Sequence, residues 1–211
     1  MPLKRRPPED WHLYLVLDRF IIPDDRKLLK AARGAASAGV SAIQLRDKYG
    51  AFGGSLRLAK KIKRICGRYH VPFIVNDRID IALASGADGL HIGRSDISLS
   101  LARRLLGKAK ILGVSAGSLK EAARARREGA DYIGAGPVFP TPVKKGKKPI
   151  KRSVLRAMKD MNVPIIVIGG INLKNVAGLV GDGFRRVAVI RAVLRSRSPY
   201  KAVKRLREVI G

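Results

Sequence analysis

Cysteine, long apolar runs and an export signal are scarce or missing in this chain of 211 residues. Cys66 is the only cysteine, which excludes an intramolecular disulfide and a cysteine-based metal cluster. The longest uncharged apolar run, residues 163–171, has nine residues, whereas a helix that crosses a bilayer needs about 20. The basic start at residues 4–6 is interrupted by Glu9 and Asp10 before a short apolar stretch, so it does not fit a secretory signal. We therefore expect a cytoplasmic protein with no membrane span.

Acidic and aromatic residues are also few. The chain has 44 Lys and Arg but only 16 Asp and Glu, which gives a net charge of +28. Such a surface attracts polyanions at low salt, so we expect non-specific polyanion binding. Only 5% of the residues are aromatic and no zinc-finger spacing occurs, so we expect no specific nucleic-acid partner. The basic runs at residues 60–64 and 124–127 fall in helix-like segments, where solvated outer helix faces are the simpler interpretation.

Short apolar runs alternate with longer amphipathic segments along the whole chain. Each run is almost continuously apolar, which is typical of parallel strands covered on both faces. The eight runs span residues 13–17, 42–45, 73–75, 89–92, 111–114, 132–134, 165–168 and 187–190. The helix-like segments between them include residues 24–38, 55–69, 118–128 and 173–180.

Capping residues and glycines mark the ends of these segments. Asp24 and Ser118 suit helix N-caps, and Glu121 follows Ser118 at the spacing of a capping box. Glycine-containing junctions at residues 37–41, 85–89, 128–132 and 181–183 each close a helix before the next strand. This alternation predicts a single (β/α)8 TIM barrel domain over residues 1–211, in which residues 1–10 form a basic N-terminal extension. An open doubly wound sheet is the second interpretation.

Unusual residues gather where the predicted strands end, which is where (β/α)8 barrels place their active sites. Arg46, Lys48 and Lys144 bring positive charge, and the glycine pair at 169–170 exposes backbone N–H groups at an expected helix start. These are parts of phosphate sites. Asp77 and Asp96 follow neighbouring strands and offer the oxygen ligands that suit Mg²⁺. The sequence therefore predicts a site for an anionic substrate, a diphosphate above all, together with a metal ion.

Each of these features also has a purely structural interpretation. Asp77 or Asp96 taken alone would more often cap a helix. The glycine pair could form only a tight turn, and His91, on an apolar strand, would more often be a hydrogen-bonded core histidine. It is the joint placement at successive strand ends that favours a functional site.

Six short motifs follow one another along the chain. They are QLRDK at 44–48, NDR at 76–78, HIGRSD at 91–96, GVS at 113–115, GPVFPT at 136–141 and IGGI at 168–171. With them, residues 13–194 resemble the thiamine phosphate synthase family. The resemblance implies a transferase that joins hydroxymethylpyrimidine diphosphate to a thiazole phosphate, carboxylated in the family, and releases pyrophosphate. Mg²⁺ and cationic side chains would stabilise the departing pyrophosphate, and the thiazole nitrogen would attack the resulting pyrimidine-stabilised carbocation.

The resemblance also implies roles for individual residues. Asp77 and Asp96 would hold Mg²⁺, the implied cofactor, and Arg46, Lys48 and Lys144 would be the catalytic cations. The residues implied to contact the substrates are Gln44, Leu45, Arg46, Asp47, Lys48, Asn76, Ser115, Thr141, Pro142, Val143, Lys144, Gly170, Ile190 and Arg191. The implied partners are the two small-molecule substrates, and both a monomer and a homo-oligomer stay open.

Four positions depart from the family pattern. Arg94 stands in place of a usual glutamine, Gly117 of a histidine, Val143 of a threonine and Arg191 of a serine. The related thiazole tautomerase branch uses a histidine near the end of the fifth strand, so Gly117 argues against that activity. A catalytically decayed barrel that binds polyanions is the other alternative; the net charge of +28 motivates it and the intact set at the strand ends opposes it.

Overall fold

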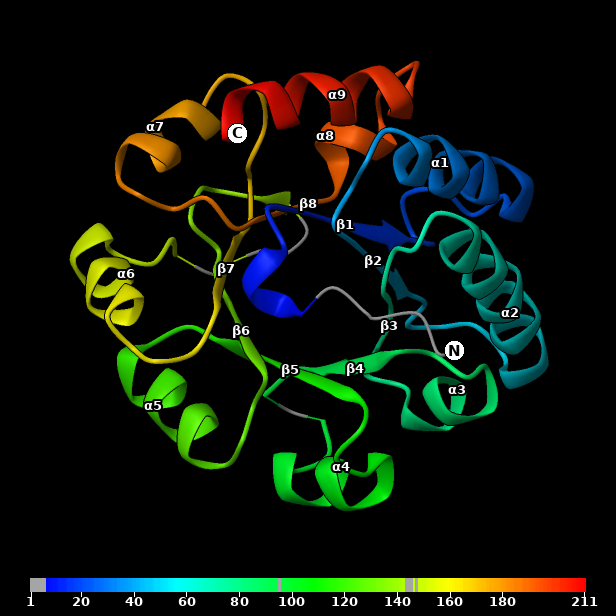
Figure 1. Ribbon diagram of the computed structural model, residues 1–211, viewed down its shortest axis with the longest axis horizontal. Helices are drawn as coiled ribbons and strands as arrows, with labels where there is room; N and C mark the ends of the chain where they lie inside the picture. Colours follow the sequence, from blue (N-terminus) through cyan, green and yellow to red (C-terminus); the bar gives the residue numbers. More distant parts are fainter. Residues whose placement is uncertain (1–6, 95, 143–145, 147) are drawn as a thin grey trace.

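A computed structural model describes residues 7–94, 96–142, 146 and 148–211. Within these residues, eight parallel strands pair in sequence order, and β8 pairs with β1 to close a barrel. Figure 1 shows this ring of strands with helices around its outside. The strands are β1 (Leu13–Asp18), β2 (Ala42–Arg46), β3 (Phe73–Asn76), β4 (Gly89–Ile92), β5 (Ile111–Ala116), β6 (Tyr132–Ala135), β7 (Ile165–Ile168) and β8 (Val187–Val189). The predicted (β/α)8 barrel is confirmed.

The helices cover the outer face of the barrel, and this is why the strand residues that face outward are apolar. They are α1 (Asp25–Ser37), α2 (Phe52–Arg68), α3 (Ile79–Ala84), α4 (Leu99–Leu106), α5 (Leu119–Arg127), α6 (Arg152–Lys159), α7 (Val176–Gly181), α8 (Arg191–Leu194) and α9 (Pro199–Ile210). Asp24 caps α1, because its side chain accepts the backbone N–H groups of Arg26 and Lys27 at 2.7 and 3.1 Å. Ser118 caps α5 by accepting the N–H of Glu121 at 3.3 Å. Both predicted caps are therefore confirmed.

Two helices begin elsewhere than predicted. α2 begins at Phe52, before the predicted residue 55. Ser55 therefore lies inside the helix, where its hydroxyl donates to Asp47 at 2.7 Å. α7 begins at Val176, after the predicted residue 173, because a turn stabilised by side chains precedes it. In that turn the N–H of Asn172 donates to the side-chain oxygen of Asn175 at 2.9 Å.

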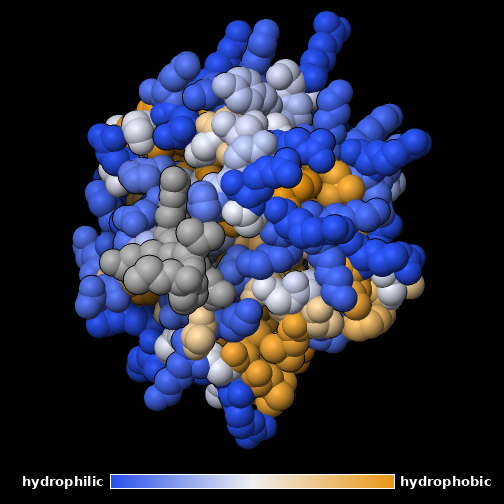
Figure 2. All heavy atoms as spheres, turned by 45° about the vertical axis from the view of Figure 1, so that its right-hand side comes forward, coloured by the Kyte–Doolittle hydropathy of each residue, from blue (hydrophilic) through white to orange (hydrophobic). Residues whose placement is uncertain are grey.

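The basic runs lie on outer helix faces, as the simpler interpretation proposed. Lys60, Lys61 and Arg64 of α2 are exposed, and so are the three arginines of residues 124–127. Lys63 is the exception in its run, because its ammonium pairs with the buried carboxylate of Asp88 at 2.6 Å. Figure 2 shows a face of the molecule covered mostly by hydrophilic side chains. No helix in the described part of the chain is long and apolar enough to span a membrane.

Residues before β1 close the amino-terminal end of the barrel. Of the expected extension over residues 1–10, Pro8–Asp10 form a short 3-10 helix, seen in the centre of the ring in Figure 1, and Pro8 is buried. Trp11 follows it with none of its surface exposed. Its ring centroid lies 5.3 Å from that of Tyr14 and 5.2 Å from that of Tyr132, two residues inside the barrel. The indole is therefore the plug beneath the barrel interior.

We predict that Trp11→Ala lowers the free energy of unfolding by about 3–5 kcal/mol, the usual cost of emptying a large aromatic site in a core. Trp11→Phe should cost clearly less, since a ring remains against Tyr14 and Tyr132. Phe20→Ala is the matched control, because Phe20 is 79% exposed and its loss should cost little. Urea denaturation of the three variants measures these values. A loss at Trp11 no larger than that at Phe20 would contradict the plug.

Candidate active site

Three cavities follow one another across the carboxyl ends of the strands. The polar pocket, about 490 Å³, lies at the ends of β2 to β6. The loop pocket, about 400 Å³, lies beyond β6, β7 and β8. A central cavity of about 80 Å³ lies between them, over the barrel floor. The central cavity shares Arg46, Asn76 and Ser115 with the polar pocket, and Ile168, Ala188 and Ile190 with the loop pocket. Together they offer room for two ligands that meet in the middle.

Two cations predicted from the sequence line the polar pocket. Arg46 is the last residue of β2, and its guanidinium donates to the carboxylate of Asp18 at 2.6 Å. Asp18 is only 2% exposed, so this ion pair holds Arg46 in one position at the rim. Lys48 follows two residues later and lines the same pocket. The wall is therefore suited to an anion that carries several charges.

Asp77 and Asp96 meet in the same pocket. A Cβ built on Gly93 would lie 2.9 Å from an oxygen of Asp96 and 4.0 Å from an oxygen of Asp77, so both carboxylates converge on this glycine. Burial, together with the neighbouring Asp96 carboxylate, raises the pKa of Asp77 from 3.8 to about 7, and Lys48 opposes the rise. The pair thus concentrates negative charge in a partly buried place.

Neither carboxylate serves as the helix cap that its sequence position allowed. The N-cap residue of α3 is Arg78, and that of α4 is Ser98. Asp77 instead has a φ of 62°, a conformation that non-glycine residues seldom adopt, and its N–H donates to the carbonyl of His91 at 2.8 Å. Asp96 accepts the N–H of Gly93 at 2.6 Å. The structure therefore removes the capping interpretation for both residues.

The acidic pair has the chemistry of a divalent-cation site. Mg²⁺ commonly takes one or two carboxylates from a protein and completes its shell with water and substrate phosphate oxygens. No group of three or more His, Cys, Asp or Glu is assembled for a metal in the described part of the chain. A pair of carboxylates beside Arg46 and Lys48 fits an ion that is shared with a phosphorylated ligand.

The central cavity combines polar residues with an apolar wall. Gln44, Asn76 and Ser115 line it, as do Val16 and several isoleucines. Sequence reasoning missed Tyr14 and Tyr132, which form part of its floor, and treated His91 only as a core residue. The signal was the alternation along each strand: Tyr14 and Val16 on β1, like Gln44 and Arg46 on β2, are two residues apart and face the same way.

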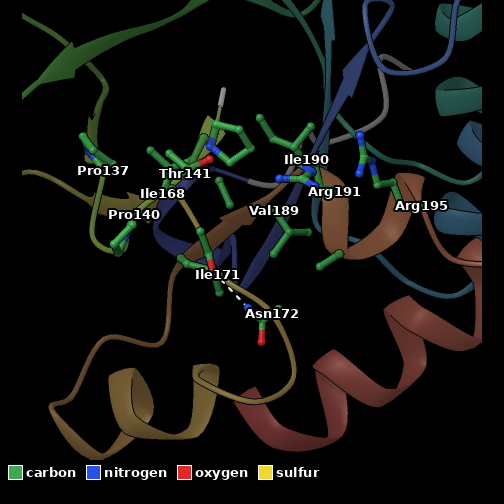
Figure 3. Close-up of a pocket in the computed structure, with 15 residues that line it drawn as sticks. Pro137, Pro140, Thr141, Ile168, Ile171, Asn172, Val189, Ile190, Arg191 and Arg195 are labelled. Atoms are coloured by element: carbon green, nitrogen blue, oxygen red, sulfur yellow. Dashed lines mark hydrogen bonds between the residues drawn. The ribbon is translucent and has the colours of Figure 1, made fainter. Parts of the chain in front are cut away.

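The loop pocket is lined by Thr141, Pro142, Gly170, Ile190 and Arg191, all predicted from the sequence. Figure 3 shows three of them, Thr141, Ile190 and Arg191, around the pocket. Gly170 has a φ of 70°, and a Cβ there would lie 2.7 Å from the carbonyl oxygen of Pro140, so only glycine fits. The expected helix start after this glycine is wrong, since α7 begins at Val176. The short helix α8 begins directly at Arg191 instead. Loops after the last two strands and a short extra helix are a common phosphate site in this fold.

Arg191 faces the loop pocket with an unpaired donor. Its Nε is buried and has no hydrogen-bond partner among the described residues. A buried N–H without a partner is costly, and an anion in the pocket would satisfy it. Arg195, one turn further along, lines the same pocket, and Figure 3 shows both arginines beside Ile190. This end of the cavity therefore also suits an anion.

Four residues that were predicted to contact the substrates are not found lining these cavities. The side chain of Leu45 is 1% exposed and packs in the layer between the barrel and the helices. Asp47 is engaged by Arg19, Ser55 and the N–H of Gly50, at 2.8, 2.7 and 3.1 Å, and organises the loop after β2. These two side chains turn away from the cavities, because they alternate with Gln44 and Arg46. Val143 and Lys144 lie outside the described residues.

Two of the unusual positions lie side by side on the wall of the polar pocket. The guanidinium of Arg94 donates to Glu121 at 2.8 Å, and the same carboxylate accepts the N–H of Gly117 at 2.6 Å. Arg94 is thus held by α5 at the edge of the pocket. Gly117 stands where the family has a histidine, so this part of the pocket wall carries no imidazole.

Comparison with known proteins gives one consistent result. Residues 13–193 match the family model described as thiamine monophosphate synthase. The thiamine-phosphate synthase of Moorella thermoacetica is 44% identical over 202 residues, which is 95% of this chain and 96% of that protein. That of Ruminiclostridium cellulolyticum is 38% identical over 201 residues, 95% of each chain.

Solved structures agree with the sequence relatives. A thiamine phosphate pyrophosphorylase from Pyrococcus furiosus superposes with a TM-score of 0.87 at 33% identity, over 96% of both chains. A 3-hexulose-6-phosphate synthase, 21% identical with a TM-score of 0.69, shares the fold alone. The match over nearly the whole length places this chain in the thiamine monophosphate synthase family.

Proposed function

We propose that this protein is a thiamine-phosphate synthase, which joins hydroxymethylpyrimidine diphosphate to a thiazole phosphate and releases pyrophosphate. One observation carries the proposal beside the family membership. Three adjoining cavities have cations and paired carboxylates at one end, and at the other end a buried arginine donor that has no partner among the described residues. Two phosphorylated substrates placed with their anionic ends apart would bring their rings together over the barrel floor. Holding reactants in this way is a large part of catalysis.

In the polar pocket, Arg46 and Lys48 bind the diphosphate and stabilise the negative charge that grows as pyrophosphate leaves. Arg46 is already fixed by Asp18, so little reorganisation is needed when the charge develops. Lys144 stays a predicted third cation. The apolar wall of the central cavity, Val16 and Ile166 among others, keeps water from the reacting carbon.

We propose that Asp77 and Asp96 hold Mg²⁺ together with the diphosphate. When bound, the ion would add positive charge against the leaving pyrophosphate oxygens. The support is the convergence of the two carboxylates on Gly93 and the raised pKa of Asp77, since a cation relieves the repulsion between them.

In the loop pocket, the backbone of Gly170 and the guanidinium of Arg191 hold the thiazole phosphate. Arg191 takes the place of the family's serine with a donor that carries a full charge. The cytoplasm is the proposed compartment, where a buried, unpaired thiol such as that of Cys66 stays reduced.

A second candidate function is non-specific polyanion binding, which the net charge of +28 favours. It would use the exposed lysines and arginines of the outer helix faces and leave the cavities free. The tautomerase alternative is not favoured, because Gly117 supplies no proton-transfer group at the end of β5.

Incubating the purified chain with both substrates and Mg²⁺ tests the proposed function. We expect thiamine phosphate and pyrophosphate to form in equal amounts, and neither to form when one substrate is omitted. No product with either the carboxylated or the plain thiazole phosphate, from a protein that is folded by circular dichroism, would contradict the proposal.

The paired carboxylates predict a pH effect on stability. The folded protein holds the Asp77 proton up to about pH 7, whereas the unfolded chain releases it near 3.8. The stabilising contribution of this group is therefore complete below pH 3.8 and lost as the pH rises through 7. We expect Asp77→Asn to be more stable than the parent by a margin that grows from pH 4 to pH 8, measured as melting temperature without metal.

Adding Mg²⁺ with inorganic pyrophosphate at pH 8 should reverse that order, by raising the melting temperature of the parent and not that of Asp77→Asn. Asp10→Asn, at an exposed position, is the control and should respond like the parent. If Mg²⁺ with pyrophosphate does not change the melting temperature of the parent protein, the metal assignment is wrong.

Truncating the cations should weaken binding of the pyrimidine diphosphate. Each charge-assisted contact contributes about 1.5–3 kcal/mol, so Lys48→Ala or Arg46→Ala should raise its dissociation constant roughly ten- to a hundredfold. Arg46→Ala should also lower stability, because it leaves the buried Asp18 unpaired. Calorimetry on Lys48→Ala, with Lys60→Ala as an exposed control, separates the two effects. Unchanged affinity in Lys48→Ala would place the diphosphate elsewhere.

Arg191→Ser should weaken binding of the thiazole phosphate about tenfold or more and leave the pyrimidine diphosphate unaffected. The ligand-free variant should be at least as stable as the parent, because it lacks a buried donor that finds no partner among the described residues. Arg205→Ser, at an exposed position of α9, is the control. Titrating each substrate separately decides the matter, and parental affinity for the thiazole phosphate would exclude the phosphate role.

A further inference from the structure

A further cation, Arg94, lines the polar pocket and has no part in the chemistry proposed above. Arg94 follows β4 by two residues, whereas Arg46 ends β2 and Lys48 comes shortly after it. Because the strands pair in sequence order, Asp77, which follows β3, lies between these two groups of cations around the rim. The acidic part of the pocket therefore has positive charge on both of its sides.

Arg94 lies farther from the place where the two rings would meet than Arg46 does. Arg46 lines both the polar pocket and the central cavity. Arg94 lines the polar pocket and an outer groove of about 430 Å³ between α4 and α5, and it is not among the described residues that line the central cavity. A diphosphate whose ring lies in the central cavity extends away from it, and this is the side on which Arg94 is placed.

Glu121 of α5 holds Arg94 at this side of the pocket. Arg94 Nη1 donates to Glu121 Oε1 at 2.8 Å, and the second oxygen of the carboxylate accepts the N–H of Gly117 at 2.6 Å. Glu121 is fixed in turn, because its own N–H donates to the capping hydroxyl of Ser118 at 3.3 Å. Burial acts to raise the pKa of Glu121, but the N–H of Gly117 and the Arg94 guanidinium hold it below 4.5. The carboxylate is therefore ionised at neutral pH.

The guanidinium of Arg94 keeps donors for a ligand. Arginine has five N–H donors, and among the described residues Arg94 has one partner, Glu121, through Nη1. Its side chain is 49% exposed, so it can turn toward an anion without disturbing packed neighbours. Gly117 leaves the adjoining space open, since a Cβ there would lie 3.9 Å from Arg94 Nη1 and a longer side chain would compete for that space. A phosphate group matches the planar fork that remains.

The ion pair with Glu121 also has a purely structural explanation, in which Arg94 only ties the loop after β4 to α5. An exposed ion pair contributes little to stability, so this explanation predicts a small change in melting temperature and no change in ligand affinity when Arg94 is replaced. The position of Arg94 on the pocket wall favours the opposite outcome.

We propose that Arg94 binds the second phosphate of the pyrimidine diphosphate, the one farther from the ring, and so selects a diphosphate over a monophosphate. This inference rests on the proposed function. When the bond between the pyrimidine methylene carbon and the diphosphate oxygen breaks, its electron pair leaves with the oxygen, and the contact to Arg94 stays with the pyrophosphate. Inorganic pyrophosphate is therefore itself a ligand of Arg94.

Calorimetry with Mg²⁺ and inorganic pyrophosphate tests this contact without turnover. Arg94→Gln removes the charge and keeps a side chain that can donate to Glu121. We expect the dissociation constant of pyrophosphate to rise roughly tenfold, as for the loss of one charge-assisted contact. Arg94→Lys should recover part of the affinity, because it restores the charge and lacks the fork.

Arg124→Gln is the matched control. Arg124 lies one turn further along α5, pairs with Glu128 at 2.6 Å, and lines the outer groove. It is not among the described residues that line the polar pocket. The control removes the same charge from the same side of a protein with a net charge of +28, and it should keep the parental affinity for pyrophosphate. An equal loss in both variants would show a general charge effect and contradict the proposal.

Binding of the pyrimidine diphosphate and of the pyrimidine monophosphate shows which phosphate Arg94 contacts. In Arg94→Gln the diphosphate should lose about tenfold in affinity, while the monophosphate keeps the parental value. Equal losses for both ligands would place Arg94 at the phosphate next to the ring and overturn the proposed selection.

Pyrophosphate affinity that is unchanged in Arg94→Gln, or absent in the parent, would reduce Arg94 to a tie between the loop after β4 and α5. The failure of the proposed function gives a different result. A parent protein that binds pyrophosphate through Arg94 and forms no thiamine phosphate would contradict the proposed function, while the contact between Arg94 and pyrophosphate would stand.

Discussion

The burial of Asp77 beside a second carboxylate, Asp96, is the constraint on which the arrangement of the site depends. Burial, together with the neighbouring Asp96 carboxylate, raises the pKa of Asp77 to about 7, so the ligand-free pocket is not at its electrostatic optimum. Arg46 and Lys48 only partly offset this charge. On the proposed function, a cation brought in with the diphosphate would complete the balance, and the pocket would then prefer a metal-bound anion to either component alone.

The closed barrel is what makes such a concentration of charge possible. Strands β2 to β5 end at one rim, so residues that are far apart in the sequence face a common pocket. The stability comes from elsewhere: the apolar layer between strands and helices, and the aromatic plug of Trp11, Tyr14 and Tyr132 at the opposite end. Because most of this packing lies away from the rim, the rim can carry unfavourable groups such as the buried donor of Arg191. The tyrosines belong to both regions, and through them the plug supports the floor of the cavity.

Local patterns were enough to predict the strands, the first helix cap and the residues of the rim. The strands are short, buried and mostly apolar, and Asp24 accepts two backbone N–H groups, which are properties of a few neighbouring residues. The side chains that turn away, Leu45 and Asp47, follow from the same alternation that turns Gln44 and Arg46 inward. The late start of α7 depends on specific hydrogen bonds of Asn172 and Asn175, which no periodicity reveals.

Long-range pairs were beyond the reach of the sequence. The hydroxyls of Tyr14 and Tyr132, which are hydrogen-bonded, are 118 positions apart in the sequence. Arg46 and Asp18, which form an ion pair, are 28 positions apart. Such contacts depend on barrel closure and on the strand register, neither of which a single sequence specifies. Predicting that His91 is a hydrogen-bonded core residue was correct as far as it went. Its two partners, and the cavity that one of them faces, appear only once the barrel is closed.

The central claim is that the adjoining cavities at the carboxyl ends of the strands hold two anionic substrates with their charged ends apart. A crystal structure of the protein with Mg²⁺, a non-hydrolysable pyrimidine diphosphate and the thiazole phosphate tests this most directly. The diphosphate should lie against Arg46 and Lys48 with the ion between Asp77 and Asp96, and the thiazole phosphate should lie against Gly170 and Arg191. Both ligands in the same pocket, or a phosphate bound only on the outer helix faces, would contradict the claim.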